Sequence, residues 1–344
     1  MNDASDNHGD QENTLSTYSV DIETLQQAAL AGDPQALFQL AINYEQGRGV
    51  AENHQEAFYC YHQAAELGHV TAQLNLGWAY SNGIGVPQDN DKAFYWYQKA
   101  ARQGHPTAQF DLGFCYINGL GVEKDEHQAI SWYTKAAEQG HAVAQRNLGW
   151  IYANSSTQQN WEQAVYWYRQ AAEQGDPRAQ YNLGWCYENG FGVQPNLDKA
   201  LVWYHKSALQ GQITAQYTLG WCYGNGRGVE VDMNKAVYWY TKAAEQGHNT
   251  AQLNLGWCHL NGKGTPVNHA EALKWYLKAA EQGNATAMFN VGNCYAHGYG
   301  IEENDEEAEA WYRKAIANGN KKAASALRHL HSKQEKNQES GSQA

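Results

Sequence analysis

The sequence predicts an all-α fold, a right-handed α/α solenoid of about eight 36-residue helix-turn-helix repeats with a helical cap at each end. Three observations predict it. An alanine recurs every 36 residues, once after 35; a leucine, or a valine in the eighth unit, follows it by four; and a glycine comes next in most units. Alanine and leucine at this spacing form one apolar stripe of a helix, and repeats that cannot bury such a stripe alone must stack on their neighbours. The recurring alanines are Ala36, Ala72, Ala108, Ala144, Ala179, Ala215, Ala251, Ala287 and Ala323.

The first helix of each unit has recognisable start and stop signals. In Gly32-Asp33-Pro34, aspartate suits the N-cap and proline suits the first helical position, where its missing N–H is no loss. The helix is expected to end at Asn-Gly-x-Gly-Val, as in residues 82–86, with glycine as the left-handed C-cap. Gly77 lies inside the helix, where glycine costs about 1 kcal/mol. Its recurrence predicts the close approach of a neighbouring helix.

The second helix of each unit carries a Trp-Tyr pair. In the second unit it runs from Ala93 through Trp96 and Tyr97 to Ala101, and Gly104 opens the next unit. One face of this helix must be buried, so we interpret its Trp-Tyr pairs as packing residues.

The ends of the array are predicted to be caps. Residues 19–31 look like a second helix without its first, and 320–331 like a first helix without its second. Arg328 replaces the helix glycine there and would keep a further unit away. The solenoid is therefore predicted to span 19–331, between polar, disordered tails at 1–18 and 332–344. Its units start near residues 32, 68, 104, 140, 175, 211, 247 and 283.

The complete pattern resembles a known family. A-x-x-x-L-G-x-x-Y-x-x-G-x-G-V followed by A-x-x-W-Y-x-K-A-A-E-x-G is similar to the Sel-1-like repeat, an α/α relative of the tetratricopeptide repeat, over roughly residues 32–319. The resemblance implies a protein-interaction scaffold rather than an enzyme. It also implies an adaptor role in bacterial signalling, envelope assembly or host interaction, and it puts the side of the first helix opposite the repeat core on a concave surface.

A helical wheel predicts which residues of the first helices lie on that concave surface. With 100° per residue, Ala72 and Leu76 lie on the packing side and Trp78 lies opposite. We therefore predict a partner-binding groove with two aromatic columns and a column of amides, interrupted by a few charges such as Asp111. Its predicted residues are Trp78, Phe114, Trp150, Trp185, Trp221 and Trp257; Phe110, Tyr181 and Tyr217; and Asn75, Asn147, Asn182, Asn254 and Asn290.

Three interpretations of this face stay open. The tryptophans could pack on one another between adjacent first helices, as aromatic stripes commonly do. They could anchor a partner peptide, whose backbone an asparagine can meet as both donor and acceptor. Aromatic rings beside amides also suit a glycan. A second asparagine column, which includes Asn82 and Asn189, either lines the groove or only ends the helices.

The cysteines and histidines predict no catalytic or metal site. Five of the six cysteines share one position in the repeat. Stacked helices lie about 8–10 Å apart, beyond the roughly 7 Å limit for a disulfide, so we expect reduced thiols that act as small hydrophobic residues. His69, His105, His141 and His248 lie one or more repeats apart, so their side chains are not expected to converge on one metal ion. No Ser-His-Asp set, HExxH motif or phosphate loop is present, so we expect no cofactor and no enzymatic activity.

The net charge and the hydropathy of the chain indicate which classes of partner and which compartment to expect. A net charge of −12 disfavours phosphate backbones and anionic lipid surfaces, which attract lysine and arginine. The N-terminus has no secretory pattern, and no run of about 18 apolar residues could span a membrane. We therefore expect a cytoplasmic protein, or one delivered to a host cytosol by a non-classical route, and a monomer.

The fourth unit departs from the pattern. After Tyr152 the chain reads ANSSTQQNWEQA, one residue short and without Gly-x-Gly-Val. This is either drift in a surface loop, which loops tolerate, or a functional change of curvature or a contact loop that presents Trp161.

Overall fold

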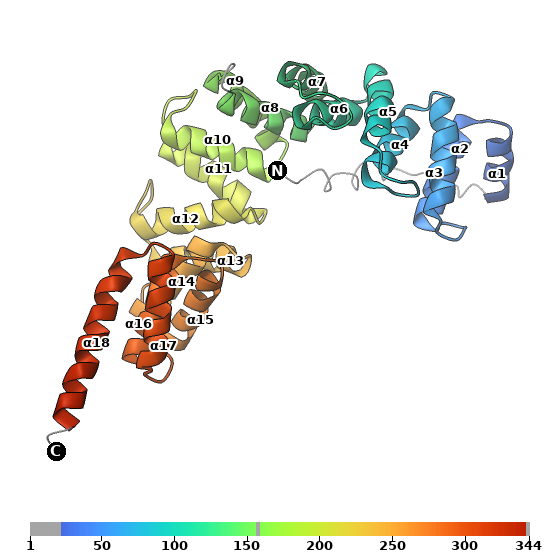
Figure 1. The fold of residues 1–344 in the computed structure, drawn as a ribbon. Helices are drawn as coiled ribbons and strands as arrows, with labels where there is room; N and C mark the ends of the chain where they lie inside the picture. Colours follow the sequence, from blue (N-terminus) through green and yellow to red (C-terminus); the bar gives the residue numbers. More distant parts are fainter. Residues whose placement is uncertain (1–21, 156–158, 342–344) are drawn as a thin grey trace. The chain divides into compact units, whose positions relative to one another are not determined.

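The computed structural model (Figure 1) describes residues 22–155 and 159–341, and every regular element in those ranges is an α-helix. The first helices of the eight repeats are α2 (Pro34–Gln46), α4 (Val70–Asn82), α6 (Pro106–Asn118), α8 (Ala142–Asn154), α10 (Pro177–Asn189), α12 (Ile213–Asn225), α14 (Asn249–Asn261) and α16 (Ala285–His297). The second helices are α3 (His54–Glu66), α5 (Asn90–Arg102), α7 (Glu126–Glu138), α9 (Trp161–Glu173), α11 (Leu197–Leu209), α13 (Met233–Glu245), α15 (His269–Glu281) and α17 (Asp305–Ala317). Helices α1 (Ile22–Leu30) and α18 (Lys321–Gly341) flank the array.

The chain divides into an N-terminal part, Met1–Leu148, and a C-terminal part, Gly149–Ala344. The boundary falls inside α8. Within each part, the first helix of a repeat packs on the second helix of the same repeat, and that second helix packs on the first helix of the next repeat (Figure 1). Each part is therefore a stack in which a repeat contacts its neighbours, which confirms the predicted all-α solenoid.

The predicted helix signals are confirmed. The Asp33 carboxylate accepts a hydrogen bond from the Gln35 N–H at 2.9 Å, with Pro34 in the first turn. At the other end of a first helix, Gly83 has φ 71° and its N–H donates to the Ala79 carbonyl oxygen. A left-handed residue there satisfies a carbonyl that the helix itself leaves unpaired.

The glycines inside the first helices are needed for close packing. A Cβ on Gly77 would lie 2.7 Å from Tyr97 Cδ1, and one on Gly220 would lie 2.5 Å from Tyr240 Cδ1. Both distances are shorter than a carbon–carbon contact allows. From the second repeat to the eighth, a tyrosine of the second helix therefore lies directly against the first helix of its own repeat.

Six of the eight first helices carry a buried glutamine, and in α4 it joins three helices. Gln73 Nε2 donates to the Ala65 carbonyl oxygen at 3.0 Å, and Gln73 Oε1 accepts from Gln103 Nε2 at 2.8 Å. Buried amides need such partners. The bond to the following glutamine recurs at Gln109, Gln180, Gln216 and Gln252, so the column connects neighbouring repeats.

The C-terminal cap is longer than predicted. Ala323 and Leu330 of α18 are buried against the last repeat, whereas Arg328 faces solvent. The helix α18 continues to Gly341, ten residues beyond the predicted end of the cap at residue 331. Lysine, glutamine and glutamate are good helix formers, and no glycine or proline interrupts them before Gly341. The predicted tail at 1–18 lies outside the described residues.

Candidate functional site

Four tryptophans of the predicted groove lie on the solvent side of the first helices. The exposed fraction is 44% for Trp150, 38% for Trp185, 39% for Trp221 and 46% for Trp257. All four belong to the C-terminal part, and we call this set the Trp face. A folded protein rarely leaves so regular a series of large apolar side chains uncovered without a use for it. In the N-terminal part, Trp78 and Phe114 hold the same position and are partly buried.

The second asparagine column fixes the ends of the helices that carry these rings. Asn189 Nδ2 donates to the Trp185 carbonyl oxygen at 2.9 Å. The same bond at the same length joins Asn82 to Trp78, Asn118 to Phe114, Asn154 to Trp150, Asn225 to Trp221 and Asn261 to Trp257. This column therefore helps to end the first helices, and it does so through Nδ2 alone.

The other predicted aromatic column takes part in packing. Phe110 is 9% exposed, and its ring stacks on His141 at 4.9 Å between centroids. Tyr217 stacks on His248 at 4.4 Å, and Tyr181 lies 5.4 Å from Tyr204. Tyr181 and Tyr217 are partly buried and flank the Trp face. Phe110 is inaccessible, so we leave it out of any binding surface.

The amide column at the Asn75 position is partly engaged inside the protein. Asn75 lies beside the Tyr61 hydroxyl, which donates its hydrogen bond to Glu45 Oε2 at 2.8 Å. Asn147 lies beside Tyr133 and Asn254 beside Tyr240, whereas Asn182 and Asn290 lie partly buried on their first helices. The helical wheel of a single helix could not reveal these neighbouring tyrosines.

The first residue of α9 in the fourth repeat brings a further ring to the Trp face. Trp161, the first residue of α9, stacks on Phe191 at 4.6 Å between centroids, and both rings lie near Trp185, at 5.8 and 4.8 Å. We call these three residues the aromatic cluster. Corresponding positions of other repeats hold Leu197 and Arg227, so the sixth repeat has no such cluster.

An acidic residue occupies the amide position of the third repeat. Asp111 is partly exposed as a residue, but its Oδ2 atom is buried and has no hydrogen-bond partner in the described part of the chain. Tyr97, Tyr133 and Cys115 are nearby groups whose own ionisation Asp111 opposes. Burial raises the pKa of Asp111 from 3.8 to about 7. The folded chain therefore holds this carboxyl as a neutral acid up to near pH 7.

We expect Asp111→Asn to stabilise the protein at pH 8 and to change little at pH 4. The raised pKa means that stability is lost as pH rises from about 4 to about 7. The full shift corresponds to about 4 kcal/mol, and partial exposure should reduce the gain to about 2 kcal/mol. Urea unfolding of the wild type and of Asp111→Asn at both pH values measures this gain in the free energy of unfolding. Asn75→Asp, the reverse exchange at the same position one repeat earlier, should destabilise at pH 8; equal effects of Asp111→Asn at both pH values would contradict the interpretation.

The cysteines do not form a reactive site. All six cysteines are free and buried, as expected, and burial raises the pKa of Cys186 and Cys222 to about 12. Such thiols are poor nucleophiles and poor metal ligands. Among the described residues, no cluster of histidine, cysteine and acidic side chains could hold a metal ion.

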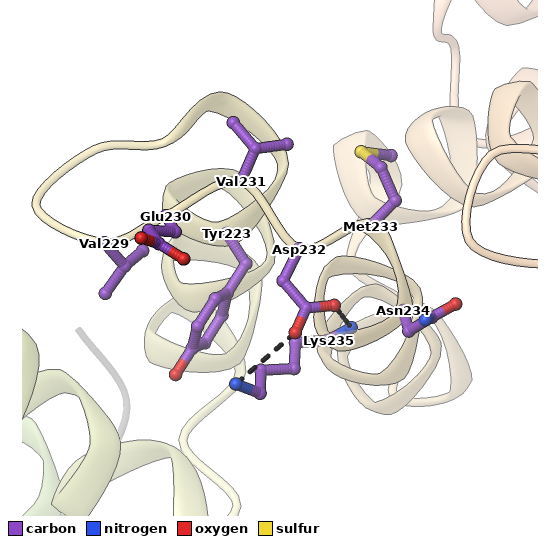
Figure 2. A pocket seen from close by; sticks show the side chains of 8 residues that line it. All are labelled: Tyr223, Val229, Glu230, Val231, Asp232, Met233, Asn234 and Lys235. Atoms are coloured by element: carbon purple, nitrogen blue, oxygen red, sulfur yellow. Dashed lines mark hydrogen bonds and ion pairs between the residues drawn. The ribbon is translucent and has the colours of Figure 1, made fainter.

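A hollow beside α13 is explained by a helix cap (Figure 2). It is lined by Tyr223 and residues 229–235. Asp232 Oδ1 accepts from the Lys235 N–H at 3.0 Å, and Oδ2 pairs with Lys235 Nζ at 3.4 Å. The same pairing joins Asp89 to Lys92 in the second repeat at 3.1 Å. The hollow is thus part of the repeat's architecture.

The second helices present a contrasting aromatic surface. Their tryptophans are buried or partly buried, as predicted, and several are covered by the lysine three residues later, with Nζ 4.6 Å from the Trp96 ring and 3.9 Å from the Trp132 ring. The sequence reasoning missed an exposed series that precedes these tryptophans, made of Tyr59, Tyr95, Tyr166, Val202 and Tyr238. A helical wheel of the second helix would have found it.

The repeat units correspond to an established family. The Sel1 repeat matches eight consecutive segments, at residues 34–69, 70–105, 106–141, 142–176, 177–212, 213–248, 249–284 and 285–320. The chain belongs to the Sel1-repeat family. Proteins with Sel1 repeats are generally protein–protein interaction scaffolds, and their solenoid fold is typically non-enzymatic.

Two solved Sel1-repeat structures resemble this chain over most of its length. The protective antigen c5321 of uropathogenic Escherichia coli strains is 35% identical, with a TM-score of 0.87, over 91% of this chain and 68% of that one. A Sel1 repeat protein from Oxalobacter formigenes is 34% identical, with a TM-score of 0.71, over 90% of each chain. No curated protein matches the sequence. Within residues 22–155 and 159–341, this Sel1-repeat chain has no helix with the length and apolar character needed to cross a bilayer.

Proposed function

We propose that this Sel1-repeat protein is a scaffold that binds an extended segment of a partner protein along the Trp face of its C-terminal part. The observation that carries the proposal is the exposure of Trp150, Trp185, Trp221 and Trp257, one in each of four consecutive repeats. Tryptophan is enriched among the residues that contribute most to protein interfaces. The proposed face corresponds to the concave surface that the family resemblance implies.

Amide oxygens beside the rings would meet the backbone of the segment. Asn189, Asn225 and Asn261 are exposed, and each uses its Nδ2 for the helix end. Their Oδ1 atoms are still acceptors for backbone N–H groups of a partner. Acceptors repeated once per repeat suit an extended chain, which offers donors at regular intervals.

The aromatic cluster is the proposed centre of the site. Its three rings come from two repeats and enlarge the apolar area around Trp185. Anchors near the middle of an interface, where water is excluded, usually contribute most to the affinity. Of the two interpretations of the short loop in the fourth repeat, the proposal therefore uses the functional one, a contact loop that presents Trp161.

A glycan is the second candidate ligand. The exposed ring of Trp185, with the Asn189 amide close by in the chain, has the composition of a surface on which a sugar can stack. A glycan array read with wild type and Trp185→Ala distinguishes the two ligands. Sugar binding that the variant loses would favour the glycan.

The setting proposed for this scaffold is a reducing compartment such as the cytosol, because free, buried cysteines suit it. The net charge of −12 supports a protein partner rather than nucleic acid or an anionic membrane.

Hydrogen exchange with a captured partner tests the proposal. Partners are first identified by pull-down and mass spectrometry with the wild-type chain. We expect the bound partner to slow exchange in α10, α12 and α14, which carry the Trp face, and to leave α11, α13 and α15 unchanged. Protection confined to the second helices would place the site on the exposed Tyr59 series instead and would overturn the proposal.

A further inference from the structure

Histidine caps the first helix in four repeats, three of them consecutive. His69 Nδ1 accepts a hydrogen bond from the Ala72 N–H at 3.1 Å. The same bond joins His105 to Ala108 at 3.5 Å, His141 to Ala144 at 3.2 Å and His248 to Ala251 at 3.2 Å. The other caps of this type are Asp33, Asp176, Gln212 and Asn284. The N-terminal part therefore depends on three histidine caps, at α4, α6 and α8.

The bond that each cap makes requires a neutral imidazole. In His69, Nε2 lies 3.0 Å from Gln35 Oε1, an acceptor, which assigns the proton to Nε2 and leaves Nδ1 as the acceptor for the helix. Protonation would place a second proton on Nδ1, opposite the backbone N–H. It would also put a positive charge at the positive end of the helix dipole.

We propose that the N-terminal part of this protein is acid-responsive, because protonation of His69, His105 and His141 releases the first turns of three consecutive first helices. The amide caps Gln212 and Asn284 of the C-terminal part do not titrate and would hold their helices at the same pH.

The surroundings of the caps favour the neutral form. Burial lowers the pKa of His69 and of His105, and lowers that of His141 to about 4. The charged or titratable groups that face His141 are His105 and Arg146, and both oppose its protonation. The rings stacked on the caps, Phe38 at 4.4 Å and Phe110 at 4.9 Å, would attract an imidazolium. That attraction is smaller than the combined loss of the cap bond and the unfavourable dipole.

The direction of the pH effect follows from these shifts. An unfolded histidine takes up a proton near pH 6.5, whereas the folded cap does so only at lower pH. Stability is therefore complete above about pH 6.5 and falls as pH decreases toward 4. For His141, a pKa near 6.5 in the unfolded state and of about 4 in the folded state predicts that the first turn of α8 opens about thirtyfold more at pH 5 than at pH 7.5.

Native-state hydrogen exchange at pH 7.5 and pH 5, corrected for intrinsic rates, tests the proposal on the full chain. We expect the first turn of α8 to open at least tenfold more at pH 5 and those of α4 and α6 to open more as well, with α12 and α16 unchanged. The variant His69→Asn, His105→Asn, His141→Asn should lose this response, because asparagine already caps α16. His62→Asn, whose ring packs on Trp96 and caps no helix, should keep it.

Single variants and a titration cover the case in which the triple variant does not fold. Each single His→Asn change should abolish the acid response of its own helix only. In a histidine NMR titration of the wild type, the three caps should titrate below the ordinary value near 6.5. Equal acid opening of amide-capped and histidine-capped helices, or cap titration near 6.5, would overturn the proposal.

Discussion

Replacing Trp185, Trp221 and Trp257 together with alanine is expected to abolish binding of the partner segment and to leave the fold largely intact. Each interface anchor of this kind is worth about 2 kcal/mol or more on truncation. Three such losses would remove most of a micromolar affinity, which totals about 8 kcal/mol. The fold should persist because the packing positions of the same helices, such as Leu183 and Leu219, are fully buried and unchanged. Titration calorimetry beside a thermal melt measures both effects.

Two control variants show whether the Trp face itself binds. The first control variant combines Tyr166→Ala, Val202→Ala and Tyr238→Ala. These changes remove exposed side chains of the second helices in the same part of the chain, with exposed fractions of 52%, 55% and 53%. This variant should bind normally. Alanine at Cys186, Cys222 and Cys258, which are buried, should also leave binding nearly intact. If the tryptophan variant melts far lower while the cysteine variant loses the partner, the face assignment is reversed.

Replacing Leu327 and Leu330 with aspartate is expected to unfold the C-terminal end of the array first. Leu330 is 4% exposed and Leu327 is partly buried against the last repeat. Truncation of a buried leucine costs about 2–5 kcal/mol, and a buried charge adds to that cost. Because a solenoid sums the interfaces between neighbours, hydrogen exchange should rise in α16, α17 and α18 while α10 to α13 stay protected.

The matched control places the same charges on the outer side of the same helix. Ser325 and His329 of α18 are exposed, so Ser325→Asp with His329→Asp should leave exchange in α16 and α17 unchanged. A uniform loss of protection along the C-terminal part in the leucine variant would contradict a stack of independent interfaces and would indicate one cooperative unit.

Features that depend on local spacing were predictable from the sequence. The caps at Asp33 and Gly83 follow from the backbone chemistry of helix ends, and the close approach at Gly77 follows from the cost of glycine inside a helix. The exposed side of Trp185 followed from the helical wheel alone. Each of these rests on residues within one turn or one helix, or on a pattern repeated eight times, so no knowledge of partners in space was needed.

The parts of the site that the sequence did not predict depend on contacts between helices. The Phe110 position points to the same side as the Trp position on an isolated helix, yet stacking on His141 of the next repeat buries it. Asn75 lies beside Tyr61 of the preceding second helix.

The sequence by itself therefore determined the repeat, its two helices, its caps and the face that carries the tryptophans. The tertiary structure alone decided which side chains of that face are accessible, that Trp161 joins Trp185 and Phe191, and that a buried oxygen of Asp111 finds no hydrogen-bond partner among the described residues. The physical reason is that accessibility and electrostatic environment depend on neighbours about 14 to 31 residues away in the chain, such as Tyr97 for Asp111 and His141 for Phe110, which a helical period cannot specify.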